Sequence, residues 1–226
     1  MKKVKKIKKV WYEDDFSGNS RSLIAAFAGQ LIVPGKFEWA NTWAGLYKDL
    51  DFKKIRLCDH KLSWYQTTFP DIDGYGPYAL AKFLKNKIEE ANVDKVAFMG
   101  LSMGGYGALL LGEILEVDQV ITFSPQTHLT KGRYKKASLD KRFKGFDIDK
   151  DRTDFKYVLE NSKNKKTIYH IYYGDLNKSD VSHAKRIEHF DNVVLHPVPS
   201  KVHTVARVLV KDGTVGKIMK NFIDGK

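Results

Sequence analysis

The sequence predicts an α/β fold in which a mostly parallel central sheet is flanked by helices. Short apolar runs alternate along the chain with segments of helical period, a pattern typical of strands joined by crossover helices. Residues 95–100 (KVAFMG) are apolar enough to predict a strand buried on both faces at the centre of the sheet. We find no internal repeat and no Pro- or Ser-rich linker, so the 226 residues are expected to form one domain.

The expected elements follow in order along the chain. Short apolar runs predict strands at residues 22–29, 53–59, 95–100, 119–125, 167–174 and 192–199. Two longer segments predict helices, at 77–91, which opens with a proline in its first turn, and at 103–115, which is rich in Gly, Ala and Leu. The alternation of strands with helices indicates a parallel sheet.

The segment between residues 126 and 166 interrupts this alternation. It spans about forty residues, far more than a compact domain usually spends on a connection, so it is expected to hold structure of its own. Its acidic stretch from residue 151 predicts a helix over 151–160. Its earlier part is basic, with Lys131, Arg133, Lys135, Lys136, Lys141, Arg142 and Lys144 against Asp140. We interpret it as a lid-like basic insertion over the carboxyl edge of the sheet.

The net charge of +12 raises the question of an anionic partner. Six lysines lie in the first nine residues and seven further basic residues lie between Lys131 and Lys144, which makes two clusters and not one stripe. No nucleic-acid partner is therefore expected, whereas a small-molecule, glycan or lipid ester, possibly anionic, remains a possible substrate. No apolar run follows the first lysines and none approaches the length of a membrane span, so neither a signal peptide nor a transmembrane segment is predicted. The single cysteine, Cys58, favours a reducing, cytoplasmic location.

The chemistry of this chain is expected at Gly100-Leu101-Ser102-Met103-Gly104. A predicted strand leads into this G-x-S-x-G motif and a helix rich in small residues leads out of it, which is the context that the motif requires. The glycines leave room for a sharp turn that lifts the hydroxyl of Ser102 clear of the sheet. The amide of Met103 opens the following helix and is a natural donor to a developing oxyanion. A phosphate-binding loop would instead have a lysine after its last glycine.

The motif resembles the nucleophile elbow of the α/β-hydrolase superfamily. The resemblance implies a serine hydrolase with Ser102 as nucleophile, and a chain order of serine, then acid, then histidine. His203 matches the expected base, because it follows the last predicted strand and a short turn and opens the next helix. His196 is the competing histidine, but it lies inside that strand, where a structural role is more usual.

The acid is left open between two aspartates, Asp175 and Asp180, which both follow the strand that ends at Gly174. Many members of the superfamily carry the acid about three residues beyond such a glycine, and Asn177 occupies that position here. Other compact esterases carry it slightly later, just before a helix, which favours Asp180. Its alternative role is that of a helix N-cap, which Ser179 could fill instead.

The resemblance also implies a second oxyanion donor in the loop after residues 22–29, where the amide of Gln30 is favoured. No metal ligand is predicted, because the histidines and acids lack spacings such as H-E-x-x-H. No cofactor is expected either, because no dinucleotide or phosphate fingerprint is present.

Three functions use these features. An esterase would pass the acyl group to water, and an acyltransferase with the same three residues would pass it to an alcohol or a sugar. A non-catalytic binding protein would keep the fold, but its serine, histidine and acid would not lie within hydrogen-bond reach of one another.

Overall fold

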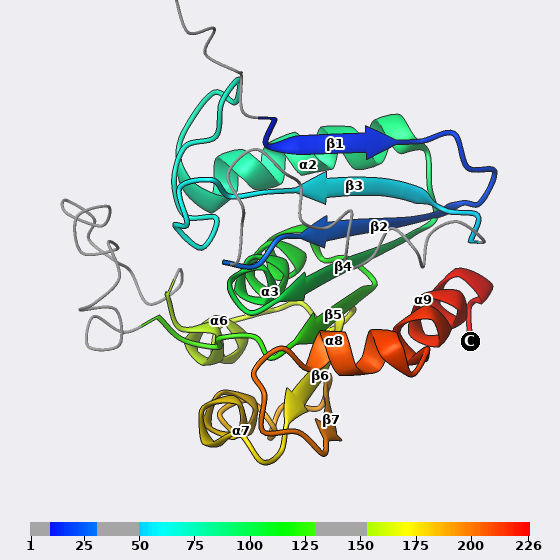
Figure 1. Ribbon diagram of the computed structural model, residues 1–226. Coiled ribbons are helices and arrows are strands. Elements are labelled where there is room, and N and C mark those ends of the chain that lie inside the picture. Colours follow the sequence, from blue (N-terminus) through cyan, green and yellow to red (C-terminus); the bar gives the residue numbers. More distant parts are fainter. Residues whose placement is uncertain (1–9, 31–49, 130–152) are drawn as a thin grey trace, which may run out of the picture.

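A computed structural model describes residues 10–30, 50–129 and 153–226 of the chain. Its centre is a seven-stranded sheet in the order β1-β3-β2-β4-β5-β6-β7 (Figure 1). The strands are β1 (Tyr12–Asp15), β2 (Ser22–Phe27), β3 (Lys53–Leu57), β4 (Lys95–Leu101), β5 (Gln119–Phe123), β6 (Ile168–Gly174) and β7 (Val193–Val198). Only β1 runs antiparallel to its neighbour among the paired strands described. The predicted α/β class with a mostly parallel sheet is therefore confirmed.

Helices cover both faces of the sheet (Figure 1). One face packs against α2 (Gly76–Ala91), α3 (Met103–Leu115), α6 (Phe155–Glu160) and α7 (Lys178–Lys185). The other face packs against α8 (Val205–Lys211) and α9 (Thr214–Asp224). Residues of β4 alternate between the two layers, because successive side chains of a strand point to opposite faces. Val96 and Phe98 pack toward α2 and α3, and Ala97 and Met99 pack toward α8 and α9.

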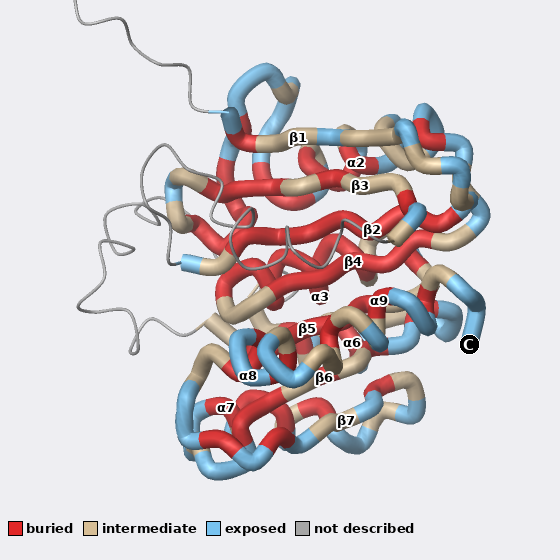
Figure 2. The backbone as a smooth tube through the Cα atoms, turned by 45° about the vertical axis from the view of Figure 1, so that its right-hand side comes forward, coloured by how far each residue is buried: buried red, intermediate tan, exposed pale blue. Residues whose placement is uncertain are grey.

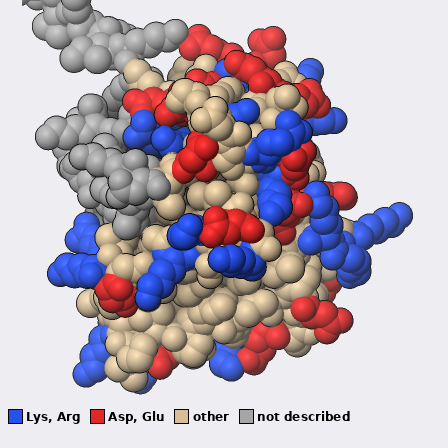
Figure 3. Space-filling view, turned by 90° about the vertical axis from the view of Figure 1, so that its right-hand side faces the viewer, with Lys and Arg blue, Asp and Glu red and all other residues tan. Residues whose placement is uncertain are grey.

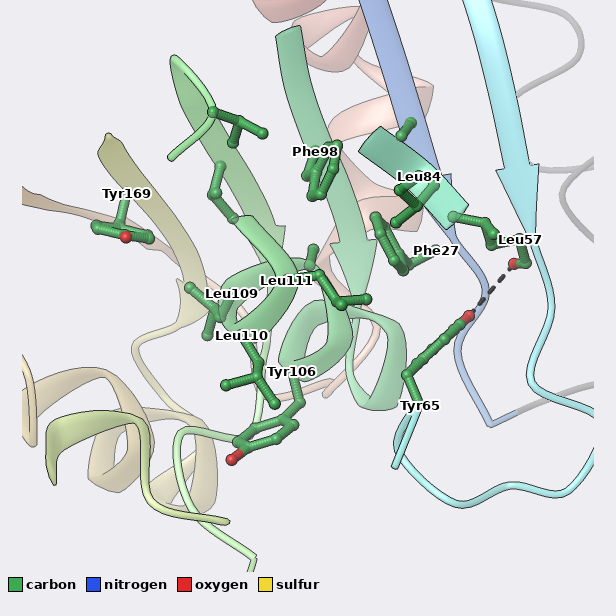
Figure 4. Close-up of a cluster of buried hydrophobic side chains, with 14 of the residues drawn as sticks. Phe27, Leu57, Tyr65, Leu84, Phe98, Tyr106, Leu109, Leu110, Leu111 and Tyr169 are labelled. Carbon is green, nitrogen blue, oxygen red and sulfur yellow. Dashed lines mark hydrogen bonds between the residues drawn. The ribbon is translucent and has the colours of Figure 1, made fainter. Parts of the chain in front are cut away.

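The central strands are buried along almost their whole length, as the red tube of β2 and β4 shows in Figure 2. The layer beside α3 is rich in aromatic side chains, of which Figure 4 labels Phe27, Phe98 and Tyr106. Tyr65 joins this layer and its hydroxyl donates to the carbonyl oxygens of Ala28, at 3.0 Å, and Leu57, at 3.2 Å. These bonds tie the loop after β3 to the carboxyl ends of β2 and β3.

The ends of the predicted insertion are described, whereas residues 130–152 with their basic cluster lie outside the described residues, as do the lysines of residues 1–9. The two ends pair with each other: the amide of Leu129 donates to the Thr153 carbonyl, at 2.8 Å, and that of Phe155 to the Thr127 carbonyl, at 2.9 Å. The helix expected over 151–160 is present as α6, and Asp154 caps it by accepting from the Lys156 amide.

The charges of the described surface are mixed. Figure 3 shows lysine and arginine interspersed with aspartate and glutamate over the face seen there. Across the described ranges, no helix has both the length and the apolar content that a membrane crossing requires.

Candidate active site

Ser102 lies in the sharp turn between β4 and α3. Its backbone has φ 53° and ψ −116°, a conformation that costs a non-glycine residue about 1–3 kcal/mol and that persists only where the surroundings fix it. The surroundings do so through the backbone, since the Ser102 amide donates to the Phe123 carbonyl of β5 at 3.0 Å and the Ser102 carbonyl accepts from Tyr106 at 3.1 Å. The predicted strand–turn–helix context is present.

Two glycines make this turn possible. A Cβ on Gly100 would lie 2.2 Å from the carbonyl oxygen of Gly104, and a Cβ on Gly104 would lie 2.1 Å from the carbonyl oxygen of Phe27. Both contacts are with backbone atoms, which cannot move aside as a side chain could. The close approach of β4, α3 and the end of β2 therefore requires glycine at both positions.

His203 lies between Ser102 and Asp180. Its Nε2 is 2.8 Å from Ser102 Oγ, and its Nδ1 is 2.7 Å from Asp180 Oδ1. Ser102 follows the central strand β4. Asp180 and His203 follow β6 and β7, which lie toward one edge of the sheet. His203 stands just before α8, which starts at Val205, so it precedes the helix that it was expected to open.

The surroundings of Asp180 separate it from Asp175. Asp180 is buried, and its second carboxylate oxygen accepts a hydrogen bond from the hydroxyl of Ser124 at 2.8 Å. Asp175 is exposed, and its amide bonds the Val198 carbonyl at 3.0 Å. The aspartate that the structure places against His203 is therefore Asp180.

Asn177, which occupies the position where many family members carry the acid, caps α7. Its side-chain oxygen accepts from the amides of Ser179 and Asp180, at 3.0 and 3.3 Å. Neither Ser179 nor Asp180 serves as the N-cap, so the carboxylate of Asp180 is left to meet His203.

The two expected oxyanion donors come from different elements, Met103 from the start of α3 and Gln30 from the loop after β2. Met103 is buried and is the first residue of α3. Gln30 is exposed and follows β2, whose end passes close to the elbow, as the approach of Gly104 to Phe27 and Ala28 shows. Their roles as donors remain predictions.

Sequence reasoning missed two side chains of this site, both from the loop after β5. The Ser124 hydroxyl bonds Asp180, and the Gln126 side-chain nitrogen, Nε2, lies 3.1 Å from Ser102 Oγ. The carboxyl ends of parallel strands meet at one edge of the sheet, which is where such sheets bind ligands, and this rule could have pointed to them.

Trp64 and Tyr65, in the loop after β3, are buried in the core, while the aromatic residues of 39–47 lie outside the described part. The indole of Trp64 nevertheless reaches Gln126: its Nε1 donates to the Gln126 carboxamide oxygen at 3.4 Å.

His196 lies away from Ser102, in β7. Its Nε2 is 3.1 Å from Nδ1 of His170 in β6, and its ring stacks on Tyr172 with 4.2 Å between ring centroids. Burial, and secondarily the neighbouring His196, lowers the pKa of His170 from 6.5 to about 4. Burial also lowers the pKa of His196. The pair is therefore neutral at physiological pH. Across the described ranges, no three His, Cys, Asp or Glu residues gather as metal ligands would.

The sheet topology and the sharp turn at Ser102 can be compared with those of known proteins. No protein-family model matches the chain, and no curated protein matches it. Solved structures do, and they show that the chain has the α/β-hydrolase fold.

Three of these structures show the extent of the likeness. The capsule O-acetyltransferase of Neisseria meningitidis serogroup A has a TM-score of 0.70 at 17% identity, over 93% of this chain and 90% of its own. MenH from S. aureus has a TM-score of 0.63 at 12% identity, over 96% and 98%. A lipase-esterase related protein from Clostridium acetobutylicum has a TM-score of 0.59 at 14% identity, over 95% and 100%. The fold thus extends over nearly the whole chain.

Proposed function

We propose that this protein is a serine hydrolase that cleaves a carboxylic ester through an acyl-enzyme intermediate. The observation that carries the proposal is the continuous path of hydrogen bonds from Ser102 Oγ through His203 to Asp180, with steps of 2.8 and 2.7 Å. A nucleophile in reach of a base, and a base oriented by a third group, is the arrangement that activates a serine hydroxyl.

In the first half of the reaction, neutral His203 accepts the proton of Ser102 through Nε2 while Oγ attacks the ester carbonyl carbon. The carbonyl oxygen becomes an oxyanion, to which the amides of Met103 and Gln30 donate. The intermediate then collapses, the bond to the alcohol oxygen breaks, and His203 returns the proton to that oxygen. The alcohol leaves and the acyl group stays on Ser102.

In the second half, water takes the place of the alcohol. His203 accepts a proton from the water as its oxygen attacks the acyl carbon, and then gives the proton to Ser102 Oγ as the acid is released. Asp180 accepts a hydrogen bond from the Nδ1–H of His203, which fixes the imidazole tautomer and stabilises the imidazolium that forms in each half.

Burial makes Asp180 suited to this role. The carboxylate is held on one oxygen by Ser124 and on the other by His203, so its position is fixed before the substrate arrives. A binding protein without turnover would not need these three side chains in register, so the distances favour catalysis.

An acyltransferase is the second candidate. It would use the same residues, with an alcohol or sugar hydroxyl in place of water, and the likeness to a capsule O-acetyltransferase over 93% of the chain is the reason to test it. This likeness, at 17% identity, is one of fold and does not by itself assign the activity.

The test is labelling with a fluorophosphonate probe, followed by mass-spectrometric mapping of the adduct, with Ser102→Ala as the control. We expect a single adduct on Ser102 and none in the variant. Turnover of an activated acetate ester with and without added glycerol then separates the two candidates, because a transferase yields acetylated glycerol in preference to acetate. Absence of an adduct on Ser102 would contradict both.

A further inference from the structure

Gln126 brings a side-chain amide to the nucleophile. Its Nε2 lies 3.1 Å from Ser102 Oγ, the atom that His203 Nε2 approaches to 2.8 Å from its own direction. Gln126 is half-buried, in the loop that follows β5. Neither of the two hydrogen bonds that join Ser102 to Asp180 through His203 requires this amide.

The contact with Trp64 fixes which atom of the carboxamide faces the serine. An indole N–H can only donate, so the atom that Trp64 Nε1 approaches at 3.4 Å is the carboxamide oxygen. The group beside Ser102 Oγ is therefore the NH₂ group, which has two hydrogens and no acceptor.

Only one of these hydrogens is used in the part of the chain that the structure describes. The Ser102 hydroxyl donates its hydrogen to His203 Nε2 and accepts a hydrogen bond from one N–H of Gln126 Nε2. The second N–H of Gln126 meets no protein acceptor among the described residues. It is a donor held beside the reacting atom and left for a ligand.

The sheet order indicates which part of an ester would meet it. Gln30, the expected oxyanion donor, follows β2 on one side of β4, whereas Gln126 follows β5 on the other side, toward β6 and β7. His203 follows β7 and must reach the alcohol oxygen to protonate it. The alcohol part of the ester is therefore expected on the side of Gln126, and the carbonyl oxygen on the side of Gln30.

We propose that Gln126 is a specificity-determining residue that donates its second amide hydrogen to an oxygen atom of the alcohol part, next to the scissile bond. The substrate class that this selects is an acyl ester of a polyol, in which the carbon next to the one that bears the acylated oxygen carries another oxygen. A simple alkyl ester has no acceptor at that position. This inference rests on the proposed function and adds the leaving group to it.

The experiment compares two acetate esters of equal length, methoxyethyl acetate and butyl acetate, which differ by one ether oxygen in place of a methylene. An ether oxygen accepts but does not donate, so only a donor of the protein can recognise it. The measured quantity is the ratio of kcat/KM for the two esters in the wild type and in Gln126→Met, which keeps the side-chain length and lacks the donor. Taking this ratio between proteins cancels the intrinsic reactivity of each ester.

We expect the preference for the ether ester to fall about three- to tenfold in Gln126→Met, as the loss of one neutral hydrogen bond predicts. Gln126→Glu, which has only acceptors at neutral pH, should lose it as well. The matched control is Thr127→Val in the same loop, whose hydroxyl donates to the His183 carbonyl at 2.9 Å and not to Ser102. This control should keep the wild-type ratio.

A Gln126 that merely supports the loop would slow both esters alike, so an unchanged ratio in both Gln126 variants overturns the inference. If fluorophosphonate still labels Ser102 in that case, the proposed function stands and the recognition by Gln126 does not. If Ser102 is not labelled in the wild type, the proposed function fails and the inference fails with it.

Discussion

The two halves of the candidate site are held in different ways. Ser102 is positioned by the backbone: a positive φ, main-chain hydrogen bonds and glycines whose missing Cβ atoms let β4, α3 and the end of β2 meet. Asp180 and His203 are positioned by side chains, through the hydroxyl of Ser124 and the contact between the two. The candidate nucleophile is thus held by the backbone of the fold, whereas the candidate acid and base are held by side-chain contacts. Substitutions of the glycines that shape the first half should therefore affect stability, whereas substitutions of the reacting side chains in either half should affect the reaction.

The largest effect is expected for Ser102→Ala. Loss of the hydroxyl removes the nucleophile, and ester hydrolysis should fall by about 10⁴-fold or more, as in other enzymes that lose this member of the triad. The measurement is kcat for an activated acetate ester, with circular dichroism to verify the fold. Turnover close to that of the wild type would show that Ser102 is not the nucleophile.

Asp180→Asn should come next, with kcat lower by about 10³–10⁴-fold, because the amide no longer holds the His203 tautomer that accepts the serine proton. Asp175→Asn is the matched control, since Asp175 is exposed and close to the same helix. It should change kcat little. The opposite ranking would transfer the role of the acid to Asp175.

Gly104→Ala tests the nucleophile half through stability. The added Cβ would overlap the Phe27 carbonyl oxygen at 2.1 Å, and overpacking against backbone should cost about 3 kcal/mol of the free energy of unfolding. Gly213→Ala is the control: its φ is +79° with open space around it, so only backbone strain is added, at about 1–2 kcal/mol. Equal losses in urea unfolding would mean that the close approach at the elbow is not rigid.

The smallest effect is expected at the histidine pair of β6 and β7, outside both halves. The pKa of His170 is about 4 in the folded protein and 6.5 in its ordinary environment. Between these values the unfolded chain binds a proton that the folded chain excludes, so the free energy of unfolding decreases as pH falls from 6.5 to 4.

In the His170→Gln variant, the free energy of unfolding should decrease less steeply between pH 6.5 and 4. Urea unfolding midpoints at several pH values measure this slope. The kcat of this variant at neutral pH should match that of the wild type, because the pair does not contact Ser102. An unchanged pH slope would contradict the assignment of this proton to His170.

Among the described strands, the sequence predicted β2 to β7 and missed β1, the antiparallel strand at one edge of the sheet. The run 95–100 and the helix 103–115 correspond closely to β4 and α3, because unbroken apolarity and the glycine turn are local signals. β1 has the sequence YEDD and carries no apolar pattern. Cross-strand ion pairs such as Glu13 with Arg56, at 2.8 Å, join residues far apart in the chain, so adjacent sequence cannot reveal this pairing.

In the candidate site, too, local features could be predicted from the sequence and long-range contacts could not. Ser102 and His203 could be located because a turn motif and the end of a strand are local features. The choice between Asp175 and Asp180 could not be made, because it depends on Asn177 taking the cap and on Ser124 reaching across from β5. Gln126 could not be predicted for the same reason, because folding alone brings it within hydrogen-bond distance of Ser102.

The paired ends of the insertion have a consequence for how this fold can change over time. Residues 127–129 and 153–155 form a closed neck, and α7 holds it twice, through Thr127 with His183 and Asp154 with Arg186, whose guanidinium lies 2.7 Å from both carboxylate oxygens. Because the neck is already closed, lengthening what it carries costs little entropy. The frame that holds Asp180 is therefore built without residues 130–152, and the length of chain between the two ends of the neck can change without altering it.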